Sequence, residues 1–177
     1  MSPPAAQDPS ERFDVVNAAD RVIGIATRAE VHRRNLWHRA VHVFVWNQAG
    51  QLLLQQRSAA KDTFPGRWAT SCAGHVDAGE TYLAAARREV REELGLGVET
   101  LSAAMGLLGK VAPCRETGWE WVAVYEVEAE GPFHFPPAEI QRLAWVSPAA
   151  LSVAIAQDPT RYAPSFSLLF QRFWRIG

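Results

Sequence analysis

Short alternating runs of apolar and polar residues dominate the first part of the chain and predict β-strands. Two such runs between residues 11 and 28, separated by the turn-forming segment Asn17 to Asp20, are typical of a β-hairpin. Residues Ala40 to Trp46 alternate histidine and aromatic residues with valine, and Gln51 to Arg57 follows a turn at Asn47 to Gly50. These two segments are therefore expected to form a second hairpin.

A helical period replaces this alternation within residues 74 to 96. At about 100° per residue, Leu83, Ala86, Val90 and Leu94 share one apolar arc. Gly95 follows directly and is suited to the left-handed conformation that ends many helices. The pattern predicts an amphipathic helix that packs through this arc.

The rest of the chain predicts further strands followed by helices. Strands are expected at residues 103–111, 120–127 and 142–146, and helices at residues 28–36, 148–159 and 165–175. Ser147 is placed to cap the second of these helices, with Pro148 at its first position. The order of elements predicts the α/β class, as a mixed sheet with helices packed on both faces.

Length and composition limit the domain organisation. The chain has 177 residues, of which 48% are hydrophobic, enough for one domain with a buried core. We expect this domain to span residues 11–177, after a disordered leader at residues 1–10 that is rich in proline, alanine and polar groups. The two cysteines, Cys72 and Cys114, are too few and too far apart for a disulfide framework, so both are expected to be reduced thiols.

Charge and hydropathy limit the partners. The formal net charge of -1 argues against an extended nucleic acid, whose backbone needs a basic surface, so the expected partner is a small molecule. No window has the length of uncharged apolar residues that a membrane span needs, and the N-terminus lacks an apolar signal segment. We expect a cytoplasmic protein without a membrane partner, and a homodimer is left open.

Acidic residues gather on another arc of the predicted helix. Glu89, Glu92 and Glu93 lie within one arc, where like charges on adjacent turns repel by roughly 0.2–0.5 kcal/mol per pair even in water. A bound cation would neutralise them. Mg²⁺, a hard ion that prefers oxygen ligands, is the expected cofactor, with Mn²⁺ as a substitute.

These residues sit in a spacing that resembles the signature of the Nudix hydrolases. The segment GHVDAGETYLAAARREVREELGL fills each constrained position of that signature, and the matching residues are Gly74, Glu80, Arg88, Glu89, Val90, Glu92, Glu93, Gly95 and Leu96. A merely solvated helix face would explain the glutamates but neither Gly74 nor Glu80. The resemblance implies an α/β/α Nudix sandwich that cleaves diphosphate linkages, here in a nucleoside diphosphate or a derivative.

The resemblance also implies roles for these residues. Glu89, Glu92 and Glu93 would bind the metal, together with the backbone carbonyl of Gly74. Glu80 would pair with Arg88 and orient the turn against the helix.

The group that accepts the proton from water is left open. Nudix members take it from a glutamate of the signature, here Glu92 or Glu93, or from a carboxylate on a distant segment. Glu120 and Glu139 are the distant candidates. An exposed strand position competes with this role for Glu120, and a surface loop or helix position is favoured for Glu139.

Several residues outside the signature have two interpretations each. Arg57 and Lys61 flank the SAAKDTFPG loop and could bind phosphate oxygens, although a solvated loop is the alternative. Core packing is favoured over base stacking for the tryptophans at positions 68, 119 and 121. His42 is equally compatible with a binding role and with a hydrogen-bonded strand position.

Residues 13 to 147 resemble the branch of this superfamily that includes type 1 isopentenyl diphosphate isomerases. His38 and His75 match two metal-binding histidines of those isomerases, and Glu120 can be placed on one metal glutamate. This resemblance raises the question of whether the three residues form a second metal site. The other isomerase glutamate falls on Gly118.

Two departures weaken the isomerase interpretation. The catalytic cysteine of the isomerases falls on Ala73, whereas Cys72 is one residue away and on a strand would face the opposite side. A further histidine falls on Val31, with His32 adjacent. We therefore favour a hydrolase, with isomerase activity and a catalytically silent nucleotide sensor as the alternatives.

Overall fold

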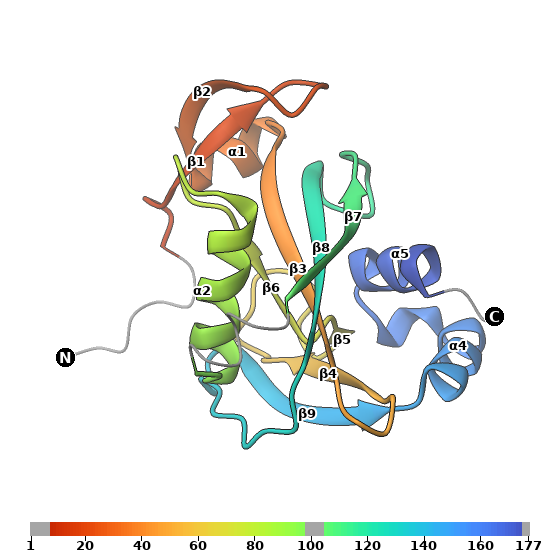
Figure 1. Ribbon diagram of the computed structural model, residues 1–177. Coiled ribbons are helices and arrows are strands. Elements are labelled where there is room, and N and C mark those ends of the chain that lie inside the picture. The colour runs from red at the N-terminus through yellow and green to blue at the C-terminus, as the bar shows by residue number, and fades with distance from the viewer. Residues whose placement is uncertain (1–7, 98–104, 175–177) are drawn as a thin grey trace.

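The computed structural model describes residues 8–97 and 105–174, which form a mixed sheet with helices on both faces (Figure 1). The strands are β1 (Arg12–Val16), β2 (Val22–Thr27), β3 (His38–Trp46), β4 (Leu52–Arg57), β5 (Trp68–Ala69), β6 (Cys72–His75), β7 (Gly106–Val111), β8 (Glu120–Glu128) and β9 (Ile140–Val146). The helices are α1 (Arg28–Arg34), α2 (Tyr82–Leu94), α4 (Pro148–Gln157), the short 3-10 helix η1 (Pro159–Arg161) and α5 (Pro164–Phe173).

Strand β3 organises the seven-stranded main sheet. The order is β5-β4-β3-β8-β7, with β6 also paired to β3 and β9 to β4. β3 and β8 are parallel, with His38 opposite Glu120, whereas the other paired strands of this sheet are antiparallel. Both faces of β3 are covered, which explains its nearly continuous burial.

Each face of the sheet has its own hydrophobic core. Helix α2 covers one face and buries Val90 and Leu94 against Val43 and Cys72. Helices α4 and α5 cover the other face, where Phe166 and its neighbours pack beneath the central strands. The expected α/β architecture, with helices on both sides of a mixed sheet, is confirmed.

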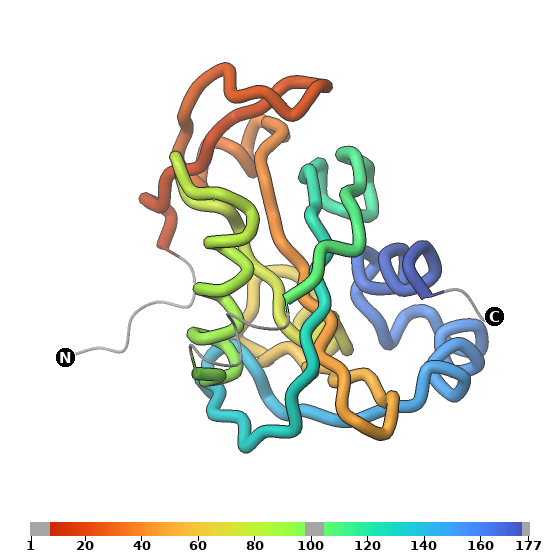
Figure 2. The backbone as a smooth tube through the Cα atoms, viewed as in Figure 1, coloured from red at the N-terminus to blue at the C-terminus, as the bar shows by residue number. Residues whose placement is uncertain are grey.

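The N-terminal hairpin and helix α1 form a separate small layer against the end of the main sheet. Phe13 and Val31 are fully buried there. The carboxylate of Asp20 at the hairpin turn accepts hydrogen bonds from Arg39 on β3 and from Tyr82 at the start of α2. Figure 2 shows the hairpin and the start of α2 at the same end of the molecule, and these hydrogen bonds tie the hairpin to β3 and to the start of α2.

Most of the predicted turns and caps are confirmed. Gly95 has φ 67°, in the left-handed region, and ends α2. Ser147 accepts a hydrogen bond from the backbone N–H of Ala150 and caps α4, with Pro148 in the first turn. The prediction of a strand from residue 103 and of a leader at residues 1–10 falls partly outside the described residues.

The prediction that Trp119 packs in the core is wrong. Trp119 is 41% exposed and has φ 67°, because it follows Gly118 in the tight turn that precedes β8. Trp121 lies within the strand and donates a hydrogen bond from its indole N–H to the carbonyl of Asn17. Over residues 8–97 and 105–174, no helix combines the length and apolar character needed to cross a bilayer.

Candidate active site

A cavity of about 610 Å³ opens beside helix α2 and brings together most of the polar residues singled out in the sequence. Its walls come from α1, α2, β3, the turn of β6, the loop between β4 and β5, and the segments that precede β8 and β9. Carboxylates, arginines and histidines share this cavity with a wall of alanines. The site therefore combines groups that bind cations with groups that bind anions.

Gly74 is required by the carboxylate that lies against it. A Cβ atom added at Gly74 would overlap the Glu89 carboxylate, which projects from α2 across strand β6. The side chain of Glu89 is only 13% exposed. The absence of a side chain at Gly74 thus allows this carboxylate to reach the cavity next to the backbone of the strand.

Arg88 fixes the carboxylates around it through several hydrogen bonds. Its guanidinium donates to both oxygens of Glu80, at 3.2 and 3.0 Å, and to Glu89 Oε1 at 2.6 Å. A further bond of 2.9 Å reaches the carbonyl of His75 and ties helix α2 to β6. Although burial lowers the pKa of Arg88, the hydrogen bonds that it donates to Glu80 and the neighbouring negative charges raise it, so the guanidinium stays charged.

Glu93 is held deeper than its neighbours. Its Oε2 atom accepts hydrogen bonds from Gln55 Nε2 at 3.1 Å and from the backbone N–H of Ala73 at 3.2 Å. Burial raises the pKa of Glu93. Burial, followed by the charge of Glu93, also raises the pKa of Glu89 to about 8.

Two buried carboxylates that favour protonation are suited to a cation. A divalent ion at this position would replace the protons and remove the cost of two like charges in a desolvated site. Glu92 differs from this pair because its side chain is 57% exposed, and it contacts Arg88 at 3.4 Å. The predicted acidic arc is therefore divided into two buried carboxylates and one that faces solvent.

The loop between β4 and β5 supplies positive charge opposite α2. Arg57 and Lys61 both line the cavity. Arg57 donates to the carbonyl oxygen of Thr63 at 2.8 Å, which closes the loop, while Lys61 pairs with Glu139. Glu139 lies in the turn before β9, in keeping with the expected loop position, and its partly exposed carboxylate also lines the cavity.

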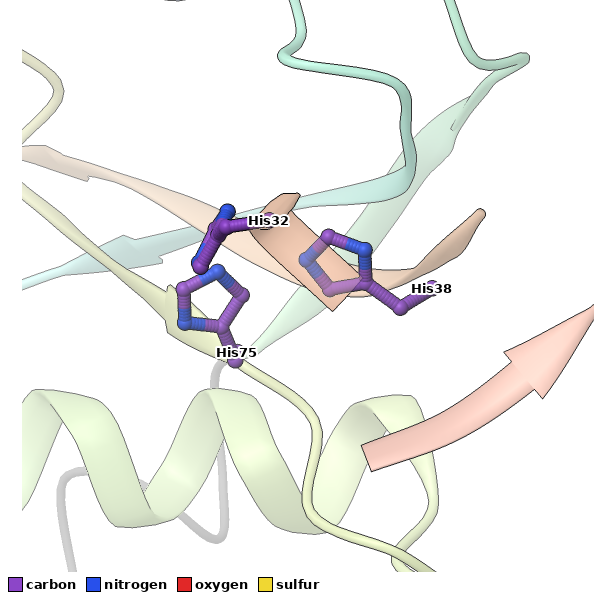
Figure 3. Close-up of side chains that lie close together, drawn as sticks. All are labelled: His32, His38 and His75. Atoms are coloured by element: carbon purple, nitrogen blue, oxygen red, sulfur yellow. The ribbon is translucent and has the colours of Figure 1, made fainter. Parts of the chain in front are cut away.

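Three histidines form a second cluster, and two of them, His32 and His75, also line the cavity. One nitrogen from each of His32, His38 and His75 lies within 4.8 Å of the others, a spacing compatible with one shared metal ion. Figure 3 shows the three imidazole rings close together. Glu120 joins the cluster, with its Oε1 3.1 Å from His75 Nε2 and 3.5 Å from His38 Nε2.

The hydrogen bonds of His38 orient it as a ligand. Its Nδ1 atom lies 2.9 Å from the carbonyl of Leu36, which can only accept, so Nδ1 carries the proton. The Nε2 atom is then a bare acceptor, and this buried atom has no hydrogen-bond donor within the described residues. Such an arrangement is typical of metal-binding histidines.

The charges within the cluster favour the neutral imidazoles that bind metals. Burial and the nearby His75 and His38 lower the pKa of His32 to about 4, and burial also lowers that of His75. Burial would raise the pKa of Glu120, but the neighbouring imidazoles of His38 and His75 outweigh it and lower the pKa. Neutral ring nitrogens beside an ionised carboxylate form a donor set for a divalent ion.

His32 follows Val31, the residue on which the further isomerase histidine falls, and it is His32 that joins the cluster. Val31 is fully buried against Phe13, whereas His32 lines the cavity. One residue rotates a helix by about 100°, so the buried role of Val31 directs His32 toward the cluster. The signal in the sequence that could have identified His32 is that Val31 is apolar and lies between polar neighbours, which predicts that Val31 faces the core and His32 another side of the helix.

The prediction that Cys72 and Ala73 face opposite sides of a strand is confirmed. Cys72 is fully buried in the core beneath α2, and burial raises the pKa of its thiol well above the usual range. Ala73 lines the cavity instead and lies opposite His42 in the sheet. The cavity therefore has no thiol on this strand.

Comparisons with known proteins agree with this geometry. The family model for the NUDIX domain matches residues 36–169. An isopentenyl-diphosphate Delta-isomerase from Nocardia farcinica is 37% identical over 159 residues, which cover 85% of this chain and 87% of that protein. A Nudix hydrolase from Deinococcus radiodurans is 36% identical over 146 residues, covering 82% of this chain and 84% of the relative.

The same similarity holds for the fold. The crystal structure of the protein DR0079 from Deinococcus radiodurans matches this one with a TM-score of 0.81 at 31% identity, over 93% of this chain and 100% of the other. This likeness supports the mixed sandwich that the sequence predicted.

Proposed function

Because this chain belongs to the NUDIX family, we propose that it is a cation-dependent hydrolase that cleaves the diphosphate linkage of a nucleoside diphosphate or a derivative. The observation that carries the proposal is the buried pair Glu89 and Glu93, which faces Arg57 and Lys61 across one cavity. One side suits a metal ion and the other suits phosphate oxygens.

We propose Glu89 and Glu93 as the main Mg²⁺ ligands, with Glu92 and the Gly74 carbonyl as further oxygen donors. The raised pKa of both buried carboxylates and the all-oxygen donor set fit a hard divalent ion, and Mn²⁺ would fit the same set. Bound there, the ion would supply positive charge to the diphosphate oxygens as water attacks phosphorus.

The remaining residues of the signature position these groups. Arg88 holds Glu89 and Glu80 in place and links them to β6 through the His75 carbonyl. Arg57 and Lys61 are proposed to bind phosphate oxygens, which would draw Lys61 away from Glu139. Arg57 and Lys61 would thus orient the diphosphate, and Arg88 would orient the carboxylates, without any of them breaking a bond.

The proton from the attacking water needs a carboxylate within reach. Among the candidates, Glu93 accepts two hydrogen bonds and Glu120 contacts two histidines, whereas Glu92 has Arg88 as its neighbour and is largely exposed. We propose Glu92 as the proton acceptor of the signature, with Glu93 and the distant Glu120 as the alternatives. Glutamine substitutions compared over a range of pH separate them, because only loss of the true base removes the acidic limb of the rate profile, where the rate falls as the base becomes protonated.

We further propose that His32, His38, His75 and Glu120 hold a second divalent ion. The unpartnered Nε2 atom of His38 and the neutral state of His32 fit this role. Arg28 contacts His75 Nδ1 at 3.1 Å and would orient that ring.

The histidine cluster also favours the second candidate, an isomerase of isopentenyl diphosphate type, because the similar protein from Nocardia farcinica is named as such an isomerase. The cavity argues against it. An isomerase must move a proton at carbon, and Ala73 offers no proton at the strand position where the isomerases carry cysteine, while Cys72 faces the opposite core.

A substrate panel separates the two candidates. The protein is incubated with Mg²⁺ and with nucleoside di- and triphosphates, sugar nucleotides, dinucleotides and isopentenyl diphosphate. Released phosphate and isomer formation are both measured. The proposed function predicts phosphate or nucleoside monophosphate release without isomer, whereas isomer formation without phosphate release would overturn it.

A further inference from the structure

We propose that His42 recognises the organic group attached to the diphosphate, and that this group is a nucleobase rather than a hydrocarbon chain. This inference rests on the proposed function and deepens it, since it concerns the part of the substrate that the metal ligands do not hold. It is carried by the position of His42 in the cavity and by the residues around it.

His42 lies on the central strand β3, on the face that lines the cavity. Its neighbours in the sheet are Ala73 on β6 and Val124 on β8. The side chain is almost completely buried, yet it forms part of the cavity wall. Its ring can therefore contact a ligand that enters the cavity.

One nitrogen of His42 is fixed and the other is available. Nδ1 lies 2.7 Å from the hydroxyl of Thr70, a residue that is itself fully buried. Within residues 8–97 and 105–174, no hydrogen bond to Nε2 is present. Because Thr70 fixes the ring, Nε2 is a positioned polar atom at a ligand-binding surface.

Small apolar side chains form part of the cavity wall to which His42 belongs. Four alanines line the cavity together with His42, at positions 40, 69, 73 and 163. Methyl groups leave a broad apolar wall, against which a planar ring can lie with its edge toward one hydrogen-bonding group. A hydrocarbon chain in the same place would cover Nε2 and leave it without a partner.

The charge state of His42 distinguishes a base from a phosphate. Burial lowers the pKa of His42 to about 4, so the imidazole is neutral near pH 7. A neutral ring exchanges single hydrogen bonds with a heterocycle edge, whereas phosphate oxygens favour cationic donors such as Arg57 and Lys61. The two kinds of group therefore divide the substrate between them.

Binding of non-hydrolysable ligands tests this assignment. Titration calorimetry with Mg²⁺ compares α,β-methylene nucleoside diphosphates of the common bases with methylenediphosphonate, which has no organic group. We expect His42→Phe to weaken the preferred nucleotide at least tenfold and to leave methylenediphosphonate within twofold. His42→Gln, which keeps a polar group near Nε2, should recover part of the loss or change the base preference.

A variant at the anchoring residue adds a matched control. Thr70→Val keeps the imidazole but removes its hydrogen-bond partner, so we expect a smaller, base-dependent loss of affinity. Circular dichroism checks that each variant is folded. Equal weakening of both ligands by His42→Phe, unchanged nucleotide binding, or no nucleotide binding by the parent protein would overturn the inference.

The same titrations separate this inference from the proposed function. Binding that depends on His42, combined with no hydrolysis of the natural nucleotides, would contradict the hydrolase and leave the assignment of His42 standing. Hydrolysis of the nucleotides, combined with unchanged nucleotide affinity in His42→Phe, would support the hydrolase and contradict the assignment of His42.

Discussion

At the residue scale, the site depends on the space that a glycine leaves for the carboxylate of a glutamate. Gly74 leaves the space in which the Glu89 carboxylate lies, and Arg88 holds that carboxylate in place. The spacing of the signature thus has a steric cause. A residue with a side chain at position 74 of β6 would not leave room for the carboxylate of Glu89 from α2.

Replacing this glycine should displace the carboxylate without unfolding the chain. For Gly74→Ala we expect kcat to fall roughly ten- to a hundredfold, because small errors in ligand position are costly in catalysis. Steady-state kinetics and circular dichroism measure the two effects. Gly24→Ala is the matched control, since a Cβ there meets no atom within 4 Å and activity should be unchanged.

The buried carboxylate next to it should matter more. Glu93→Gln keeps the shape and the contact with Gln55 but removes the charge that is proposed to bind the metal. We expect kcat to fall about a thousandfold, equivalent to about 4 kcal/mol, with the fold retained. Glu126→Gln, which changes a carboxylate outside the cavity, should keep normal kcat, and turnover that survives Glu93→Gln would contradict the metal assignment.

The shared arc of Glu89, Glu92 and Glu93 could be predicted because these three residues lie on one helix with a known angle per residue, whereas the pairing of Glu80 with Arg88 was implied by the resemblance to the Nudix signature. Glu80 and Arg88 are eight positions apart and form the expected ion pair at 3.0 Å. The bonds of Gln55 to Glu93 and of Lys61 to Glu139 could not be predicted in this way. They join residues from different strands, and their meeting depends on the register of the whole sheet.

At the element scale, helix α1 positions one end of the cavity. Its capping box joins Thr27 and Glu30, with the Thr27 hydroxyl accepting from the Glu30 N–H and the Glu30 carboxylate accepting from the Thr27 N–H. The helix carries His32 to the histidine cluster and Arg28 to His75. The sequence predicted this helix, but its rotation about its axis followed only from the burial of Val31.

Loosening this cap should weaken the second metal site. Thr27→Ala removes the box at a cost of about 1 kcal/mol, and we expect a several-fold lower affinity for Mn²⁺ at the histidine cluster. Ser147→Ala removes the cap of α4, which is part of the opposite layer, and should cost similar stability with unchanged Mn²⁺ affinity. Equal Mn²⁺ affinities in both variants would show that α1 does not position the cluster.

At the scale of the whole molecule, the proposed metal ligands come from elements that are distant in the chain. The cluster of histidines combines α1, β3 and β6, while the glutamates of α2 lie against β6 from the other side. The mixed sheet could be predicted from the alternating strands. The parallel pairing of β3 with β8, which places Glu120 opposite His38, could not, because no local pattern specifies which strands become neighbours.

This arrangement predicts that a divalent ion stabilises the fold more strongly as the pH rises. The pKa of Glu89 is raised from 4.5 to about 8 without a cation, so its contribution to stability is present below pH 4.5 and is lost as the pH rises toward 8. A bound ion compensates the charge that then develops. Thermal unfolding should therefore show a larger increase in Tm on adding Mg²⁺ at pH 8 than at pH 5.

The control for this prediction is Glu93→Gln, in which the pH-dependent effect of Mg²⁺ should be much smaller. An increase in Tm that is the same at pH 5 and pH 8 would mean that the ion does not compete with protons at this pair of carboxylates.

Anomalous diffraction from a crystal soaked in Mn²⁺ tests the central assignment most directly. We predict a strong anomalous peak between the Glu89 and Glu93 carboxylates, beside the backbone of Gly74. A crystal in which that position is empty while the protein hydrolyses its substrate with Mn²⁺ would contradict the account.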